Sequence, residues 1–215
     1  MNPLQLIIFD CDGVLVDSEA ISNRLVAELL QELSIPMSTE ESLRQFAGTS
    51  MEYIRNYIHQ LTGQPLPENF EAIYRKRSAL AFAEELQPIE GVARAIEAIP
   101  LPRCVASNGP REKIVTNLKI TGLSSFFNDR LFSAYDIQRW KPAPDLYLHA
   151  ADQMQVATQQ CVVVEDSSAG VQAAIAAGMR VLAYGGSGNA DRLQAAGATQ
   201  VFEHMSELPG LVSRL

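Results

Sequence analysis

Short apolar-rich runs alternate with helical patterns of about ten residues along most of this 215-residue chain. The runs that we expect to form strands cover residues 6–8, 103–106, 130–133, 161–164 and 180–184. The helical patterns that separate the later runs cover residues 92–99, 112–120, 144–154 and 169–177. This alternation predicts βαβ units, and therefore an α/β protein built on a parallel sheet.

Two carboxylates, Asp10 and Asp12, stand where the first strand should end, and Gly13 permits a sharp turn behind them. Two negative groups this close tend to take up a proton unless a cation holds them. The pattern therefore indicates a site for a hard metal ion, with a carboxylate left for chemistry. If only residues 10–13 are considered, the alternative is an Asp-rich turn that closes the strand.

Further polar groups follow the later strands of the predicted sheet. Ser107, Asn108 and Gly109 follow the second run, Lys141 comes after the third, and Glu165 and Asp166 end the fourth. Ligands of parallel sheets bind outside the carboxyl ends of the strands, so we expect these groups to meet at one edge. Taken singly, Ser107 to Gly109 is typical of a plain turn and Lys141 of a solvated lysine.

Together these motifs resemble those of the haloacid dehalogenase superfamily over essentially the full chain. The sequence DCDGVLVDS at residues 10–18 matches its first motif, and Ser107 matches the second. Lys141 in KPAP matches the third motif, and EDSSAG at residues 165–170 matches the fourth. Within the superfamily, the chain is most similar to β-phosphoglucomutases and small sugar-phosphate phosphatases. Residues 132–142 look especially like those of bacterial 6-phosphogluconate phosphatases.

The resemblance implies a Rossmann-like α/β core, made of residues 1–17 and 87–215, with an inserted all-helical cap at residues 18–86. Hinges would lie near residues 16–18 and 85–88. The insert carries helical patterns and a break at residues 63–67. Its apolar residues space as two helix faces: Leu25, Leu29, Leu30 and Leu33, and Tyr53, Ile54, Tyr57, Ile58 and Leu61.

By resemblance, Asp10 is a nucleophile that accepts a phosphoryl group, and Asp12 is the general acid and base. Ser107, Lys141 and the backbone amides of Asn108 and Gly109 would bind the phosphoryl oxygens.

The cofactor implied by the resemblance is Mg²⁺, which prefers octahedral oxygen coordination. Asp10 and Asp166 would offer carboxylate oxygens and Asp12 its backbone carbonyl, while Glu165 would contribute directly or through water.

The implied function is hydrolysis of small phosphorylated metabolites, such as 6-phosphogluconate, through an aspartyl-phosphate intermediate. A β-phosphoglucomutase is the alternative, but Met51 and Ser22 stand where that enzyme has an arginine and a histidine. Dehalogenases lack the aspartate that Asp12 matches, and a non-catalytic phosphate-binding protein would be expected to have lost Asp10 or the metal ligands. On the insert, Lys76 is the candidate to bind an anionic substrate. The alternative is that it lies on a solvated helix face and binds nothing.

Composition bears on the compartment and the partners. A net charge of −8 argues against nucleic acid as the main partner, and no apolar run is long enough for a membrane span. The three cysteines form no metal-binding spacing and fall in or beside expected core strands, which is typical of free thiols in a reducing compartment. We therefore expect a cytoplasmic monomer whose partner is a small phosphorylated molecule.

Overall fold

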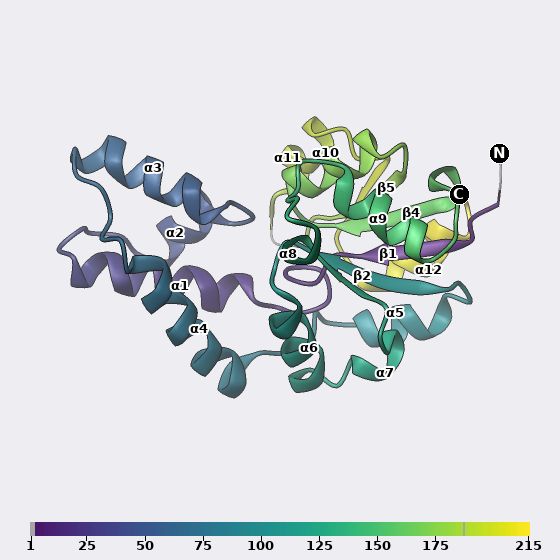
Figure 1. Cartoon of the computed structure of the whole chain (residues 1–215), viewed down its shortest axis with the longest axis horizontal. Coiled ribbons are helices and arrows are strands. Elements are labelled where there is room, and N and C mark those ends of the chain that lie inside the picture. The colour runs from purple at the N-terminus through teal and green to yellow at the C-terminus, as the bar shows by residue number, and fades with distance from the viewer. Residues whose placement is uncertain (1–2, 187) are drawn as a thin grey trace. The chain divides into compact units, whose positions relative to one another are not determined.

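The computed structural model describes residues 3–186 and 188–215, and it divides into two compact units (Figure 1). Unit 1 consists of Met1–Val16 and Gln87–Leu215, and unit 2 is Asp17–Leu86. Asp17, which was predicted to be the last residue of the first core segment, thus belongs to unit 2. None of the helices in the described part of the chain is long and apolar enough to cross a membrane.

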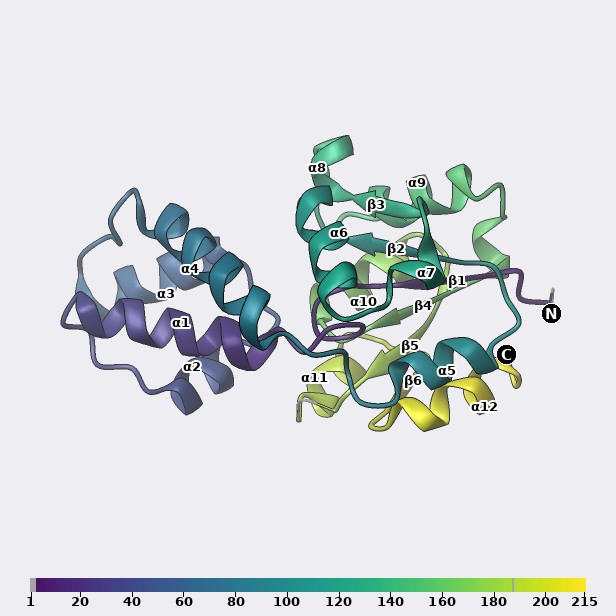
Figure 2. The same cartoon turned by 90° about the horizontal axis from the view of Figure 1, so that it is seen from below.

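Unit 1 is built on a six-stranded parallel sheet in the order β3-β2-β1-β4-β5-β6, which Figure 2 shows from one side. The strands are β1 (Leu6–Phe9), β2 (Arg103–Ser107), β3 (Leu131–Ser133), β4 (Cys161–Glu165), β5 (Arg180–Tyr184) and β6 (Gln200–Phe202). Residue Ile8 of β1 pairs with Cys104 of β2 and with Val163 of β4. The strand order reverses direction at β1, and ligands of such sheets bind beside this point.

Helices cover both faces of the sheet, which is why its central strands are apolar on both sides. They are α5 (Val92–Ala98), α6 (Arg111–Ile120), α7 (Ser124–Phe127), α8 (Ala134–Ile137), α9 (Asp145–Gln153), α10 (Ser168–Ala176), α11 (Ala190–Ala195) and α12 (Leu208–Val212). Short 3₁₀ turns cover Thr158–Gln160 and Met205–Glu207. Leu6 and Ile8 pack in one core cluster with residues of α9 and α10, such as Leu146 and Val171. On the other face, the ring of Phe9 meets Phe127 of α7 edge to face, with ring centroids 5.8 Å apart.

Unit 2 contains α1 (Glu19–Glu32), α2 (Thr39–Phe46), α3 (Met51–Thr62) and α4 (Phe70–Glu85). Local sequence sets their ends: Ser38 and Glu41 form a capping box at α2, and Ser50 caps α3. Gly63 ends α3 in the left-handed conformation, with φ of 72°. The core of the unit draws apolar side chains from all four helices: Val26, Ala27, Leu29, Leu30, Phe46, Ile54, Ile58 and Phe70.

The expected helix faces of unit 2 are only partly correct. Ile54 and Ile58, one turn apart on α3, are buried, but Tyr53 and Leu61 on the adjacent stripe are 44% and 59% exposed. Leu33 is 40% exposed because α1 has already ended at this residue. The buried faces predicted from apolar spacing alone were therefore wider than those in the structure.

Candidate active site

The turn after β1 places Asp10 and Asp12 at the carboxyl edge of the sheet. The Asp10 amide still donates to the Val164 carbonyl of β4 at 3.0 Å, so the strand pairing fixes this residue. Gly13 then turns the chain with φ of 74°. A side chain there would also collide with Asp166, because an added Cβ would lie 1.9 Å from Asp166 Oδ2. Glycine is required at this position both by conformation and by the close approach of a carboxylate.

Three carboxylates gather beside this turn. One oxygen from each of Asp10, Glu165 and Asp166 lies within 4.8 Å of the others. Burial raises the pKa of Asp10 to about 7, although the Lys141 ammonium opposes the rise. The Asp10 carboxylate is thus costly to keep charged unless further positive charge joins it.

Lys141 brings one buried positive charge to the cluster. Its Nζ lies 2.6 Å from Glu165 Oε1 and 3.0 Å from Asp10 Oδ1, and its side chain is 2% exposed. Burial by itself would lower the pKa of Lys141, but the charges of Asp10 and Glu165 outweigh it and raise that pKa. The backbone amide of Lys141 donates to Asn108 Oδ1 at 2.9 Å, which ties this loop to the end of β2.

Glu165 is saturated by protein donors. Its Oε1 accepts from Lys141 Nζ at 2.6 Å and from the Tyr147 hydroxyl at 2.9 Å. Its Oε2 accepts from the Asp166 amide and from the amide and hydroxyl of Ser167, each at 2.9 Å. Burial disfavours the charged form, yet Lys141 and the Ser167 donors hold the pKa of Glu165 below its ordinary value. Glu165 therefore anchors Lys141 and the loop that carries Asp166.

The end of β2 adds small polar groups. Ser107 is buried and its Oγ accepts from the Gly109 amide at 3.1 Å, so that amide, expected as a phosphate donor, has a partner in this structure. The Gly109 carbonyl accepts from Ser133 Oγ at 2.7 Å, which joins this loop to the end of β3. Asn108 is thus tied by its side chain to Lys141, while Ser107 bonds within its own loop, which Ser133 holds through the Gly109 carbonyl.

Asp12 faces helix α6 and lies outside the carboxylate cluster. Lys113 Nζ lies 2.6 Å from Asp12 Oδ2, and Asn117 Nδ2 lies 3.5 Å from Oδ1. A methyl group on Gly109 would lie 3.5 Å from Ser107 Oγ and 3.9 Å from Asp12 Oδ2, so these two groups flank one point.

The sequence-predicted residues of unit 1 therefore meet at one sheet edge, whereas Lys76 lies on α4 of unit 2, where it is exposed. Sequence reasoning missed Lys113 and Tyr147. Lys113 lies on α6, six residues after Ser107, and Tyr147 lies on α9, six residues after Lys141. Their helical positions were visible in the sequence, but nothing in the pattern marked them as polar partners of carboxylates.

The residues present fit a divalent cation. Asp10 Oδ1 is buried without an aligned hydrogen bond among the described residues, and the Asp166 carboxylate lies close by. Oxygen atoms in this arrangement are what hard cations such as Mg²⁺ prefer.

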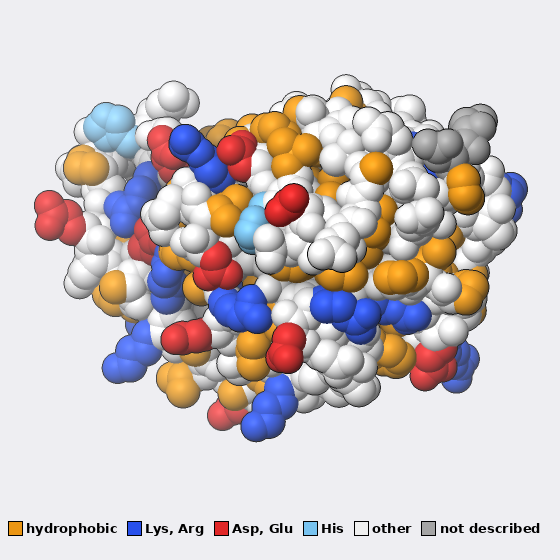
Figure 3. All heavy atoms as spheres, turned by 45° about the vertical axis from the view of Figure 1, so that its right-hand side comes forward, with side chains coloured by type: hydrophobic (Ala, Val, Ile, Leu, Met, Phe, Trp, Pro, Cys, Tyr) orange, Lys and Arg blue, Asp and Glu red, His pale blue; other side chains and the backbone are white. Residues whose placement is uncertain are grey.

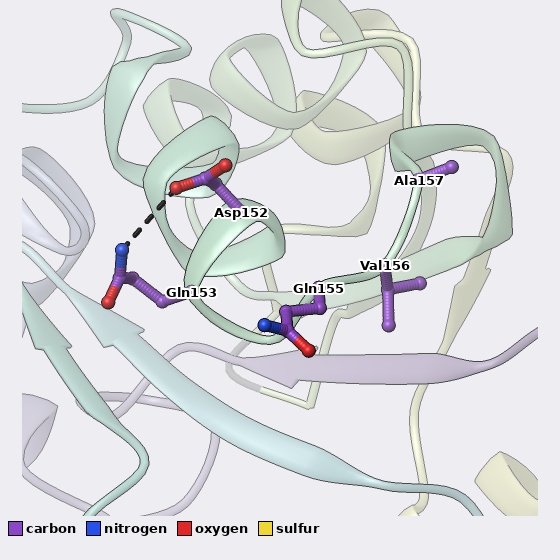
Figure 4. A pocket seen from close by; sticks show the side chains of 5 residues that line it. All are labelled: Asp152, Gln153, Gln155, Val156 and Ala157. Atoms are coloured by element: carbon purple, nitrogen blue, oxygen red, sulfur yellow. Dashed lines mark hydrogen bonds between the residues drawn. The ribbon is translucent and has the colours of Figure 1, made fainter.

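The hollow drawn in Figure 4 lies elsewhere, at the end of α9 and before the start of β4. It has a volume of about 540 Å³, and Asp152 accepts a long, 3.4 Å hydrogen bond from Gln153 at its edge. Since it lies at the amino end of β4, it is on the opposite edge of the sheet from the carboxylates, and we assign it no chemistry.

Clustered carboxylates and a buried lysine at the carboxyl edge of a parallel α/β sheet thus form a site that can bind a metal ion and an anionic ligand. Residues 4–178 match the model of the haloacid dehalogenase-like hydrolase family, and the chain belongs to this family.

Relatives of known structure or description cover nearly the whole chain. The chain is 39% identical to the 6-phosphogluconate phosphatase of Escherichia coli strain K12 over 212 residues, which are 98% of this chain and 96% of that protein. The crystal structure of a haloacid dehalogenase-like protein of unknown function from Agrobacterium tumefaciens superposes with a TM-score of 0.92, at 37% identity, and covers 98% of each chain. A family hydrolase from Deinococcus radiodurans, solved with bound phosphate and sodium, superposes at 0.83 with 28% identity, covering 99% of this chain and 96% of that one.

Proposed function

We propose that this protein is a Mg²⁺-dependent phosphatase that hydrolyses small phosphorylated sugars or sugar acids through a phosphorylated Asp10. The observation that carries the proposal is Asp10 itself, which directly follows β1, with Lys141 Nζ 3.0 Å from its Oδ1 and Asp166 in the same cluster. A carboxylate beside fixed positive charge can attack an anionic phosphoryl group that would otherwise repel it.

The steps can be assigned to residues of the chain. An Asp10 oxygen attacks phosphorus, the bond to the leaving oxygen breaks, and Asp12 gives that oxygen a proton. Water then attacks the phosphorus of the phosphorylated Asp10, gives a proton back to Asp12, and releases phosphate as Asp10 is restored. Lys141 would neutralise charge on the phosphoryl oxygens, and the Ser107 hydroxyl would donate a hydrogen bond to them.

We infer that Asp10, Asp166 and the Asp12 carbonyl hold Mg²⁺, which when bound would withdraw charge from the phosphoryl group. Glu165 supports this site from behind rather than as a direct ligand, because its two oxygens already accept five hydrogen bonds. These bonds fix Lys141 and the backbone of Asp166.

The substrate class is inferred from the relatives and from unit 2. The E. coli relative is described as a 6-phosphogluconate phosphatase, which makes a phosphorylated sugar acid the first substrate to test. We infer that unit 2 acts as a cap and that Lys76 binds the substrate carboxylate. Its neighbours are already paired, Arg75 with Glu71 at 2.6 Å and Arg77 with Glu32 at 2.6 Å. Lys76 has no ion pair with any residue that the structure describes.

We infer a cytoplasmic location from Cys11, Cys104 and Cys161, which are free and buried, as suits a reducing compartment. On the face drawn in Figure 3, acidic and basic side chains are mixed, which does not favour a nucleic-acid partner on that face. We expect the monomer to be the working unit.

The test is release of inorganic phosphate from a panel of phosphorylated metabolites, with and without Mg²⁺, by the wild type and two matched variants. Asp10→Asn should abolish turnover, since an amide is a poor nucleophile, while Asp152→Asn makes the same change in the hollow at the far edge and should leave turnover unchanged. Comparable phosphate release by Asp10→Asn and wild type would refute the proposed mechanism.

The same panel separates a phosphatase from a mutase. With Met51 and Ser22 in place of the arginine and histidine, water rather than a sugar hydroxyl should be the final acceptor. Interconversion of glucose 1-phosphate and glucose 6-phosphate without net phosphate release would establish the mutase instead.

A further inference from the structure

Two side chains of helix α6 contact the Asp12 carboxylate, one at each oxygen. Lys113 Nζ approaches Oδ2 at 2.6 Å, and Asn117 Nδ2 approaches Oδ1 at 3.5 Å. The two side chains are four residues apart, so they lie one above the other on the same face of α6. Asp12 is more than a hundred residues earlier in the chain, so this contact exists only in the folded unit 1.

Burial and packing show that the contact is built into the fold. Asn117 is 2% exposed, and its side-chain amide is directed to Asp12, which avoids the cost of an unpaired buried donor. Lys113 is 35% exposed and Asp12 is 27% exposed at their side chains, so one side of the pair still reaches solvent. The Lys113 stem packs beside Gly109, where an added Cβ would lie 3.5 Å from Lys113 Cδ.

We propose that Lys113 and Asn117 form a clamp that positions Asp12 for proton transfer. The clamp rests on the proposed function, in which Asp12 exchanges a proton with the leaving oxygen and with water. Such transfer needs heavy atoms at about 2.6–3.2 Å, and a displacement of about 1 Å can cost on the order of a hundredfold in rate. Both are positioning residues, because they act through Asp12.

The clamp has a consequence that a purely structural role would not have. A sugar alkoxide is strongly basic and needs a proton in order to leave, whereas 4-nitrophenolate is weakly basic and can leave without one. In a mechanism with a phosphorylated enzyme, kcat/KM reports only the steps up to departure of the leaving group. Loss of the clamp should therefore lower kcat/KM for a sugar phosphate and spare it for 4-nitrophenyl phosphate.

The experiment measures kcat/KM for both substrates in the Mg²⁺-loaded wild type, Lys113→Met, Lys113→Arg and a control, Lys119→Met. Lys119 is an exposed lysine on the same helix, so this control makes the same change away from Asp12. We expect Lys113→Met to lose about 10- to 100-fold with the sugar phosphate and less than about threefold with 4-nitrophenyl phosphate. Lys113→Arg, which keeps a cationic donor, should recover part of the loss, and Lys119→Met should match the wild type.

A second arm tests whether Lys113 acts through Asp12. In an Asp12→Asn background, adding Lys113→Met should cause no further loss with the sugar phosphate, because the clamped group is already gone. If Lys113→Met does not fold, judged by its melting temperature, Lys113→Gln carries the same comparison.

Each outcome decides the proposal. Equal losses with both substrates would mean that Lys113 contacts the phosphoryl group itself, and additive losses with Asp12→Asn would mean that it acts independently; either overturns the clamp. A wild type that releases phosphate from neither substrate would instead refute the proposed function, and the clamp with it.

Discussion

Gly170 on α10 controls the buried carboxylate that anchors the site, so Gly170→Ala is the sharpest structural test. An added Cβ would lie 1.7 Å from Glu165 Oε1 and 1.9 Å from its carboxyl carbon, whereas real Cβ atoms keep at least 3.0 Å. Glu165 must therefore move by more than one ångström. A shift of that size breaks the 2.6 Å contact with Lys141 and the bond from Tyr147.

The expected cost follows from three contributions. Alanine in a helix gains about 0.5–1 kcal/mol over glycine. Overpacking a filled interior costs about 1–3 kcal/mol, and separating a buried ion pair costs about 3–5 kcal/mol when the charges lose each other completely. Since Lys141 keeps Asp10 as a partner, we expect a net loss of about 2–4 kcal/mol in the free energy of unfolding.

The assay is urea unfolding followed by tryptophan fluorescence. Trp140 is the only tryptophan of the chain and lies in unit 1, so its signal reports the unit that carries the site. Gly210→Ala on α12 is the matched control, because its added Cβ would meet nothing closer than 3.4 Å, the flexible end of Arg214.

Gly210→Ala should be unchanged or slightly more stable than the wild type, and Gly170→Ala should also lose phosphatase turnover, because Lys141 loses the carboxylate that anchors it. If both variants unfold at the wild-type urea concentration, the packing of Glu165 against Gly170 does not constrain the site and the reasoning fails.

Other predictions concern the substrate, the metal and the thiols. Lys76→Ala should raise KM for phosphorylated sugar acids about tenfold more than for neutral sugar phosphates, whereas Arg75→Ala should not; equal effects would remove Lys76 from the site. Mg²⁺ should raise the melting temperature of chelator-treated wild type, since it binds only the folded site, and Asp166→Asn should abolish the shift; an unshifted wild type would contradict the metal assignment. Burial raises the pKa of the Cys161 thiol to about 11, so iodoacetamide at about pH 8 should modify the native protein slowly and the urea-unfolded chain at all three cysteines, as mass spectrometry can show. Rapid native alkylation would show that the thiols are accessible.

The sequence by itself determined the sheet and the edge at which the site forms. Apolar runs and helical patterns placed β1, β2, β4 and β5 within a residue, because strands buried on both faces must be apolar throughout. Polar residues that end such strands necessarily meet at one edge, so Asp10, Ser107, Lys141 and Asp166 could be grouped without coordinates. The edge strand β6 was missed, because it begins at the exposed Gln200 and only Val201 and Phe202 in it are apolar, too few to form an apolar run.

Tertiary structure alone decided which polar group serves which carboxylate. Glu165 was predicted to serve the metal directly or through water, and its five hydrogen bonds, which no sequence pattern indicated, also make it the anchor of Lys141 and Asp166. The pairing of Lys113 with Asp12 spans 101 residues and depends on how α6 packs against the turn after β1. Local pattern places a residue on an element, but side-chain partners depend on distances between elements, which only packing fixes.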